Sequence, residues 1–252
     1  MPSSREGEIA EIVDRVCKGH PLPGPGERPA FVRAMFASIA PRYDLMNRLM
    51  TLGQDRAWRR EVVRRAALAP RRRLLDLGSG TGDLALEALR GQPDMVAVGA
   101  DFTPQMMHVG RSRPGAEHVR WIVADALHLP FAESAFDSVV SGYLLRNVAD
   151  LPRALAEQLR VLRSGGRFVS LDTTPPPRNI LRPFIRFHLH VIIPRVGRVI
   201  TGSSAAYSYL PDSTEAFHAA EAVAEHLHAA GFREVGFVRR MLGTMAIHWG
   251  AK

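Results

Sequence analysis

Short apolar runs alternate with stretches of helical periodicity through the middle of this 252-residue chain, and no other feature constrains its fold as strongly. The runs of strand character are 72–78, 95–101, 118–125, 136–145 and 165–174, and the helical stretches between them are 82–90, 104–113 and 151–163. Strands that alternate with helices at this spacing predict an α/β fold with a parallel, doubly wound sheet. A last helix at 215–232 precedes two further strands at 235–241 and 244–250, so we expect a mostly parallel sheet of seven strands that ends in a closing pair.

The segments that flank this core differ from it in composition. Residues 1–30 include PLPGPGERP, which cannot sustain a helix, and we expect a flexible leader there. Apolar residues recur at helical spacing over 31–68, with a break at Pro41, which predicts helices before the sheet. Residues 178–205 mix apolar residues with arginine and are expected to form a helical cap, inserted into a single domain that spans 31–252.

Charge and cysteine content narrow the choice of partner and compartment. The formal charge of +8 favours nucleic acid or an anionic membrane surface as a partner, although an arginine-rich base composition gives the same excess. The basic residues are scattered and lack the interleaved aromatic side chains of a single-strand platform, so we expect no nucleic-acid partner. The lone Cys17 excludes an internal disulfide, and MPSSREGEIA has no apolar signal-peptide core, so we expect a cytoplasmic protein.

The sequence LLDLGSGTGD, residues 74–83, places a glycine loop directly after the first predicted strand. A dinucleotide fingerprint that started at Gly78 would need glycine at position 83, where the chain has Asp83, and no lysine follows to bind phosphate. Carboxylates at Asp76 and Asp83 repel a diphosphate and suit a ligand that carries positive charge. The sulfonium and ammonium groups of S-adenosylmethionine meet that requirement.

Two further carboxylates follow the next strands. Asp101 ends the second strand, where it can accept both hydroxyls of a ribose, and Asp125 ends the third, where it can meet an adenine amino group. Either aspartate can instead merely cap the helix that follows it. Glycine loop, Asp101 and Asp125 in this order resemble the class I S-adenosylmethionine-dependent methyltransferases. The resemblance implies a Rossmann-like fold, S-adenosyl-L-methionine as cofactor and a binding set of Asp76, Gly78, Gly80, Thr81, Gly82, Asp101, Asp125, Ala126 and Asn147.

Motifs outside the loop sharpen the resemblance. YDLMNRLMTLGQDRAW (43–58), LPFAESAFDSVVSGYLLRNVADLPRAL (129–155), RVLRSGGRFVSLDTT (160–174) and YSYLPDSTEAF (207–217) are similar to the signatures of the ubiquinone/menaquinone biosynthesis C-methyltransferase family. The chain departs from that pattern at Asp55, where the family has histidine, at Leu144 within YLLRN, and at Asp172, where the family has glutamate. The resemblance implies C-methylation of a prenylated quinol, either demethylmenaquinol or a ubiquinol precursor. The departures keep open another small aromatic or lipid acceptor.

The resemblance also implies roles for individual side chains. A hydroquinone carbon becomes nucleophilic when its neighbouring hydroxyl loses a proton, so a base or a charge-stabilising group is expected beside that oxygen. Tyr43, Arg146 and Asp101 are the candidate catalytic residues, and Asn47, Tyr143 and Arg146 are the candidate acceptor-binding residues. Tyr43 can equally be a packing residue and Arg146 an ion-pair partner. His248 is expected in the core, and no metal site is expected.

The arginine-rich cap suggests where the acceptor is collected. Apolar residues mixed with arginine fit a segment that receives a prenyl tail at a membrane surface, so we expect peripheral association with the inner face of the cell membrane. A cap that packs on the sheet, or that forms a homodimer contact, is the alternative.

Overall fold

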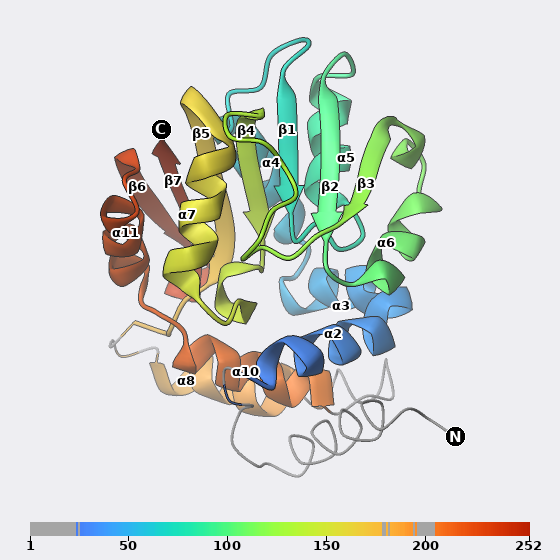
Figure 1. Cartoon of the computed structure of the whole chain (residues 1–252). Coiled ribbons are helices and arrows are strands. Elements are labelled where there is room, and N and C mark those ends of the chain that lie inside the picture. The colour runs from blue at the N-terminus through green and yellow to red at the C-terminus, as the bar shows by residue number, and fades with distance from the viewer. Residues whose placement is uncertain (1–23, 25, 178–179, 181, 194, 196–204) are drawn as a thin grey trace.

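A computed structural model of the chain describes residues 24, 26–177, 180, 182–193, 195 and 205–252 (Figure 1). Most of the expected leader, and residues 196–204 in the C-terminal part of the expected cap, lie outside these residues. The first described helix, α2 (Arg28–Ile39), begins three residues before the predicted domain boundary at 31, and Pro29 lies in its first turn. Proline is favoured there since the first helical N–H groups have no partner within the helix.

The predicted seven-stranded sheet is confirmed. Its strands are β1 (Arg73–Leu77), β2 (Val96–Asp101), β3 (Val119–Val123), β4 (Phe136–Gly142), β5 (Leu162–Thr173), β6 (Arg233–Arg240) and β7 (Met245–Ala251). Their order is β3-β2-β1-β4-β5-β7-β6, and β7 runs antiparallel to both of its neighbours while the pairs from β3 to β5 are parallel. The order reverses beside β1, which is where doubly wound sheets bind ligands.

Helices cover both faces of the sheet (Figure 1). On one face, α4 (Asp55–Arg65) and α5 (Asp83–Gly91) bury a core that includes Trp58, Val140 and Ile247. On the other face, α7 (Leu151–Val161) and α11 (Ala220–Ala229) cover a core that includes Phe168 and Leu227. One more helix, α6 (Pro104–Arg111), follows β2 in the chain and contacts that strand.

A further layer of helices lies across the carboxyl ends of the parallel strands (Figure 1). It consists of α2, α3 (Tyr43–Met50), α8 (Arg182–Phe187), the π-helical turn η4 (His188–Ile192) and α10 (Ala205–Ala216). Phe31, Met46, Leu189 and Tyr209 are among the residues that join these segments in one buried cluster. The layer closes the edge of the sheet at which the strands end. The short 3₁₀ turns are η1 (Ala40–Arg42), η2 (Ala116–His118), η3 (Leu145–Asn147) and η5 (Met241–Gly243).

One predicted element is wrong in its extent. The helix expected over 215–232 is two helices, because α10 ends at Ala216 and α11 begins at Ala220, with an extended Ala219 (ψ 154°) between them. The chain turns here because α10 lies across the strand ends whereas α11 packs against β6 and β7. Alanine-rich periodicity continues through the turn and gives no sign of it.

Candidate functional site

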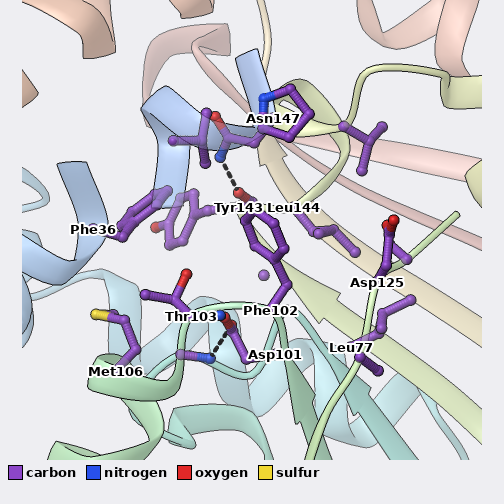
Figure 2. Close-up of a pocket in the computed structure, with 18 of the residues that line it drawn as sticks. Phe36, Leu77, Asp101, Phe102, Thr103, Met106, Asp125, Tyr143, Leu144 and Asn147 are labelled. Atoms are coloured by element: carbon purple, nitrogen blue, oxygen red, sulfur yellow. Dashed lines mark hydrogen bonds between the residues drawn. The ribbon is translucent and has the colours of Figure 1, made fainter. Parts of the chain in front are cut away.

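A cavity of about 860 Å³ opens at the carboxyl ends of β1, β2 and β4. The loops after the strands form its floor, and α2 and α3 cover it. Its lining includes Val32, Phe36, Tyr43, Gly78, Gly80, Asp101, Phe102, Met106, Asp125, Ala126, Tyr143, Leu144 and Asn147. Figure 2 shows lining residues around a common space, among them Phe36 of α2, Leu77 of β1 and Asp101 of β2. We refer to it as the first cavity.

Two of the three loop glycines form a wall of the first cavity. Gly78 has φ +68°, and a Cβ there would lie 3.0 Å from Cδ1 of Leu144. Gly80 has φ +54°, and its N–H donates to Oδ2 of Asp101 at 2.8 Å. Only glycine adopts these conformations without cost, so the backbone itself faces the cavity. Gly82 (φ +84°) is different: a Cβ would lie 2.5 Å from Trp121 of β3, so this glycine allows the start of α5 to pack against that side chain and does not line the first cavity.

The two predicted strand-end carboxylates both line the first cavity. Asp101 accepts from the N–H of Gly80 and, through Oδ1, from the N–H of Thr103 at 2.7 Å. Burial raises the pKa of Asp101, and these backbone donors oppose the rise. Asp125 accepts from the N–H of Leu127 at 2.9 Å, so it also holds the turn that follows β3.

Asp76 lies beneath the loop and is 1% exposed. It accepts from the N–H of Ala85 at 3.0 Å. Burial raises its pKa to about 7, with Asp83 and Asp101 adding to the rise. Asp76 and Thr81 line a smaller cavity of about 380 Å³ that shares Gly78, Gly80 and Tyr143 with the first cavity, so they lie beside the first cavity and not in it.

A network of ion pairs that was not predicted from the sequence ties α4 and the residue Arg113, just after α6, to the loop. Arg59 of α4 pairs with Asp55 at 2.5 Å and with Asp83 at 2.8 Å. Arg113, just after α6, pairs with Asp83 at 2.8 Å and with Asp44 at 3.3 Å. Asp55, where the chain departs from the family pattern, is therefore a fully buried partner of Arg59. The spacing of four residues between Asp55 and Arg59 was the one local signal for this network.

The hydroxyl of Thr81 donates to Oδ1 of Asp44 at 2.7 Å, which joins α3 directly to the glycine loop. Burial raises the pKa of Asp44, and the neighbouring Asp83 raises it further. Carboxylates thus outnumber guanidinium groups on this side of the first cavity. A cationic ligand is the chemistry that this imbalance favours.

A second cavity of about 930 Å³ lies beyond Tyr143, which lines both cavities. Most of its lining is apolar and comes from α3, α8, η4, η5 and β7: Met50, Phe184, Ile185, Leu189, Ile193, Met241, Leu242 and Met245. Asn47 of α3 also lines it, while Tyr43, one helical turn earlier, lines the first cavity. One short helix therefore contributes a predicted site residue to each cavity.

Four buried polar atoms of residues that line the second cavity have no hydrogen-bond partner among the described residues. They are Nδ2 of Asn47, Nε of Arg146, Oγ1 of Thr173 and Oγ1 of Thr214. Buried polar groups in folded proteins are nearly always paired, so an unpaired group beside a cavity indicates a ligand partner. Thr173 and Thr214 were not predicted from the sequence, because they come from β5 and α10 and only the fold brings them to Arg146.

Arg146 also forms the ion pair that was its alternative role. Its Nη1 lies 2.6 Å from Oδ1 of Asp172, and both side chains are almost completely buried. Burial opposes the charge of Arg146, but Asp172 outweighs burial and raises the arginine pKa. Asp172, the third position at which the chain departs from the family pattern, is thus the ion-pair partner of the buried Arg146.

The tyrosines at the junction stay protonated at neutral pH. Burial raises the pKa of Tyr43, although the nearby Asn47 amide, Arg146 and Arg59 lower it. Burial also raises the pKa of Tyr143, whose backbone has the left-handed φ of +60°. The Tyr43 ring meets Phe36 edge to face at 5.7 Å, so it packs as well as lines the site. His248 is 2% exposed and pairs with the carbonyl of Ala220 at 2.9 Å, as expected for a core histidine.

The described residues contain no group of three or more His, Cys, Asp or Glu side chains placed to hold a metal ion. Within the same residues, none of the helices combines the length and the apolar character that crossing a membrane requires.

Comparison with solved structures shows the fold. A possible histamine N-methyltransferase from Thermotoga maritima superposes with a TM-score of 0.60 at 18% identity, over 87% of this chain and 99% of that one. The [4+2]-cyclase SpnF superposes with a TM-score of 0.64 at 19% identity, over 88% and 94% of the two chains. Both share the class I methyltransferase architecture, and the second shows that this architecture also serves other chemistry.

Sequence comparison is more specific. A ubiquinone/menaquinone biosynthesis C-methyltransferase from Desulfotalea psychrophila is 48% identical over 91% of both chains. A demethylmenaquinone methyltransferase from Thermus thermophilus is 45% identical over 86% of this chain and 99% of its own. Another demethylmenaquinone methyltransferase, from Deinococcus radiodurans, is 43% identical over 80% of this chain and 85% of its own. The profile of the ubiE/COQ5 methyltransferase family matches residues 26–252, and the chain belongs to that family.

Proposed function

We propose that this protein transfers a methyl group from S-adenosylmethionine to a ring carbon of a prenylated quinol. The observation that carries the proposal is the second cavity: an apolar chamber with four unpartnered polar atoms, which adjoins the first cavity at Tyr143. A quinol has the same combination, since its ring oxygens need hydrogen-bond partners and its prenyl tail needs an apolar channel. The names of the relatives support this acceptor class.

The first cavity fits the cofactor. Gly78 and Gly80 leave the space that side chains would fill, Asp101 and Asp125 offer carboxylate oxygens for ribose and adenine, and the surplus of carboxylates suits a cation. Ala126 and Asn147 complete the proposed binding set in the first cavity, while Asp76 and Thr81 line the smaller cavity that adjoins it and Gly82 precedes α5. When bound, S-adenosylmethionine supplies an electrophilic methyl group.

The chain's own groups activate and hold the acceptor. Nε of Arg146 and Nδ2 of Asn47 are donors that stabilise the quinol oxygen as it loses its proton, which makes the adjacent ring carbon nucleophilic. Tyr143 and Tyr43 keep the ring and the cofactor apart from bulk water. Asp101, whose pKa burial raises, is our candidate to accept the released hydroxyl proton through water. After methyl transfer the same ring carbon gives up its hydrogen as a proton and the ring oxygen is protonated again, which restores the quinol, so one proton is released in all.

The acceptor is either a naphthoquinol such as demethylmenaquinol or a benzoquinol precursor of ubiquinol. The departures from the family pattern favour no different acceptor, because Asp55 and Asp172 are engaged with Arg59 and Arg146 inside the protein. Leu144 lies against Gly78 and lines the first cavity, not the second. Methylation of another aromatic or lipid acceptor is the second candidate.

Labelled S-adenosylmethionine tests the proposal, with chemically reduced short-chain demethylmenaquinol and its benzoquinol counterpart assayed side by side. We expect label in at least one quinol. A matched variant, Thr214→Val, removes one unpaired hydroxyl and keeps the shape, so the KM for the quinol should change while the Kd for S-adenosylhomocysteine stays constant. Binding of the cofactor without transfer to either quinol would contradict the proposal.

The residues at the rim of the second cavity suggest how the protein reaches a quinol whose prenyl tail lies in a lipid bilayer. Phe184 and Leu242, from α8 and η5, line the cavity and are 73% and 66% exposed, and Leu52, next to the lining residue Thr51, is 79% exposed. Exposed Arg48 and Arg182 lie on α3 and α8, and neither pairs with a carboxylate of a described residue. We propose that this rim docks on an anionic membrane, at its cytoplasmic face.

Vesicle flotation tests the docking. Vesicles that contain anionic lipid should carry the protein in low salt, and the variant with Leu52, Phe184 and Leu242 all changed to serine should stay in solution. Neutral vesicles serve as the control. If the variant instead changes the elution volume of the free protein and leaves flotation unaltered, the rim is a homodimer contact and the membrane proposal fails.

A further inference from the structure

Tyr209 lies on α10, far along the chain from the glycine loop, yet its side chain reaches Asn147, a residue that lines the first cavity. The side chain is 3% exposed, and its ring packs on that of Phe31 in α2 with centroids 5.2 Å apart. Its hydroxyl lies 3.0 Å from Oδ1 of Asn147, which lines the first cavity. A residue of the covering layer is thereby bonded to a residue of the cofactor site.

The orientation of the Asn147 amide follows from its two partners. Nδ2 of Asn147 donates to the carbonyl oxygen of Tyr143 at 2.7 Å (Figure 2). A carbonyl accepts only, so the NH₂ end must face Tyr143 and the oxygen end must face Tyr209, whose hydroxyl donates. Without that hydroxyl, Oδ1 of Asn147 is left buried with no described donor, and the amide loses what holds it in place.

Tyr143 is the residue that needs this support. Its φ of +60° is unfavourable for a residue with a side chain, and such conformations persist only where neighbouring groups hold them. Two hydrogen bonds hold its peptide groups: its N–H donates to the carbonyl of Leu171 at 2.7 Å, and its carbonyl accepts from Asn147. One of the two therefore depends on Tyr209.

We propose that Tyr209 is a positioning residue for methyl transfer: its hydroxyl holds Asn147, which holds Tyr143 between cofactor and acceptor. The inference rests on the proposed function for what the two cavities contain. Thr214 of α10 lines the second cavity, so this one helix contributes a lining residue to the second cavity and, through Tyr209, a hydrogen bond to a residue of the first. Tyr209 itself lines neither cavity, so its effect on either ligand passes through Asn147.

Tyr209→Phe removes the hydroxyl and keeps the ring. We expect the Kd for S-adenosylhomocysteine, measured by calorimetry without acceptor, to rise roughly tenfold, because the Asn147 amide and Tyr143 are no longer held in the arrangement that binds the ligand. The unpaired oxygen of Asn147 should also lower Tm. The kcat for the best quinol should fall by a similar factor. The Kd reading does not depend on turnover, so it tests Tyr209 even if the quinol assignment fails. A lower Tm with unchanged Kd and kcat would overturn the inference.

A double-mutant cycle tests the route through Asn147. Asn147→Ala removes both bonds of the amide, so adding Tyr209→Phe to it should cause no further change in Kd. If the effects of the two substitutions on Kd add independently, Tyr209 does not act through Asn147. Phe31→Leu is the packing control, since it disturbs the ring contact and leaves the hydroxyl in place; it should lower Tm without changing Kd. If it raises Kd as much as Tyr209→Phe does, the hydroxyl is not the positioning group.

Discussion

At the residue scale, the feature that most affects the chemistry of the site is a carboxylate held out of water under the glycine loop. Asp76 has its pKa raised from 3.8 to about 7, chiefly by burial. The folded protein therefore holds a proton between these two values that the unfolded chain has released, and the free energy of unfolding falls as pH rises through that window. Ionised Asp76 favours a bound cation, so cofactor affinity should fall as pH drops below about 7.

Asp76→Asn should separate these two effects. The amide cannot ionise, so we expect the Tm of the ligand-free variant to decline less than that of the parent between about pH 5 and 8. Its affinity for S-adenosylmethionine should be lower than the parent's at pH 8 and nearly independent of pH. Thermal unfolding and calorimetry across this range check both. Asp94→Asn, at an exposed site, is the control and should reproduce the parent curves. Parallel curves for Asp76→Asn and the parent would refute the assignment.

The buried pair of Arg146 and Asp172 makes a second prediction at this scale. Asp172→Asn leaves a buried guanidinium without its counter-charge, so we expect the free energy of unfolding to fall by about 3 kcal/mol. Glu234→Gln disrupts the Arg167 pair, which has a similar length of 2.7 Å but joins side chains that are 39% and 67% exposed, and should cost less than about 1 kcal/mol. Urea unfolding of the two variants compares them. Equal losses would mean that burial does not set the energetics of the Arg146 pair.

At the scale of elements, the start of α5 depends on a contact with β3. Gly82 precedes α5 at φ +84°, and a Cβ there would lie 2.5 Å from Trp121. Gly53 has a similar φ of +74°, but a Cβ at that position would have no neighbouring atom within 4 Å. The two glycines share the backbone requirement, so any difference between them measures the Trp121 contact.

We expect Gly53→Ala to lower the free energy of unfolding by about 1 kcal/mol, and Gly82→Ala by about 2–4 kcal/mol because overpacking adds to the backbone cost. Trp121→Leu, introduced into the Gly82→Ala protein, should recover part of the excess. Denaturant unfolding of the four proteins gives the comparison. If the Trp121 change recovers nothing, the backbone alone accounts for the loss at Gly82.

The sequence is sufficient to predict the elements whose signals are local. Strand and helix periodicity predicts the sheet, and the loop with Asp101 and Asp125 predicts the floor of the first cavity. The break at Ala219 has no such signal, because it is imposed by the differing directions of α10 and α11 and not by a residue type. The roles of Gly82, Arg113 and Thr214 are hidden in the sequence because their partners, Trp121, Asp83 and the second cavity, lie on other segments of the fold.

At the scale of the whole molecule, the helices that cover the strand ends should respond to the cofactor while the sheet does not. α2 and α3 cover the first cavity and join the rest of the protein through contacts such as Thr81–Asp44. We expect S-adenosylhomocysteine to slow amide hydrogen exchange over 28–50 and to leave β4 and β5, which are buried in the core, unchanged.

Exchange followed by mass spectrometry at peptide resolution is the measurement. Asp44→Asn is a useful companion, because it weakens the link between α3 and the loop; protection of 43–50 should then fall more than protection of the loop at 76–83. Protection confined to the loop in the parent protein would show that the covering helices do not close on the ligand.

The surplus of carboxylates around the loop has a consequence for turnover. A sulfonium becomes a neutral thioether when its methyl group leaves, so the reaction discharges the ligand while Asp44, Asp76, Asp83 and Asp101 stay where they are. The attraction that drew the cofactor in is thereby weakened at the moment of product formation. Spent cofactor should depart more readily than fresh cofactor, and analogues that keep a fixed positive charge at the sulfur position should be the stronger inhibitors, most of all in dilute buffer.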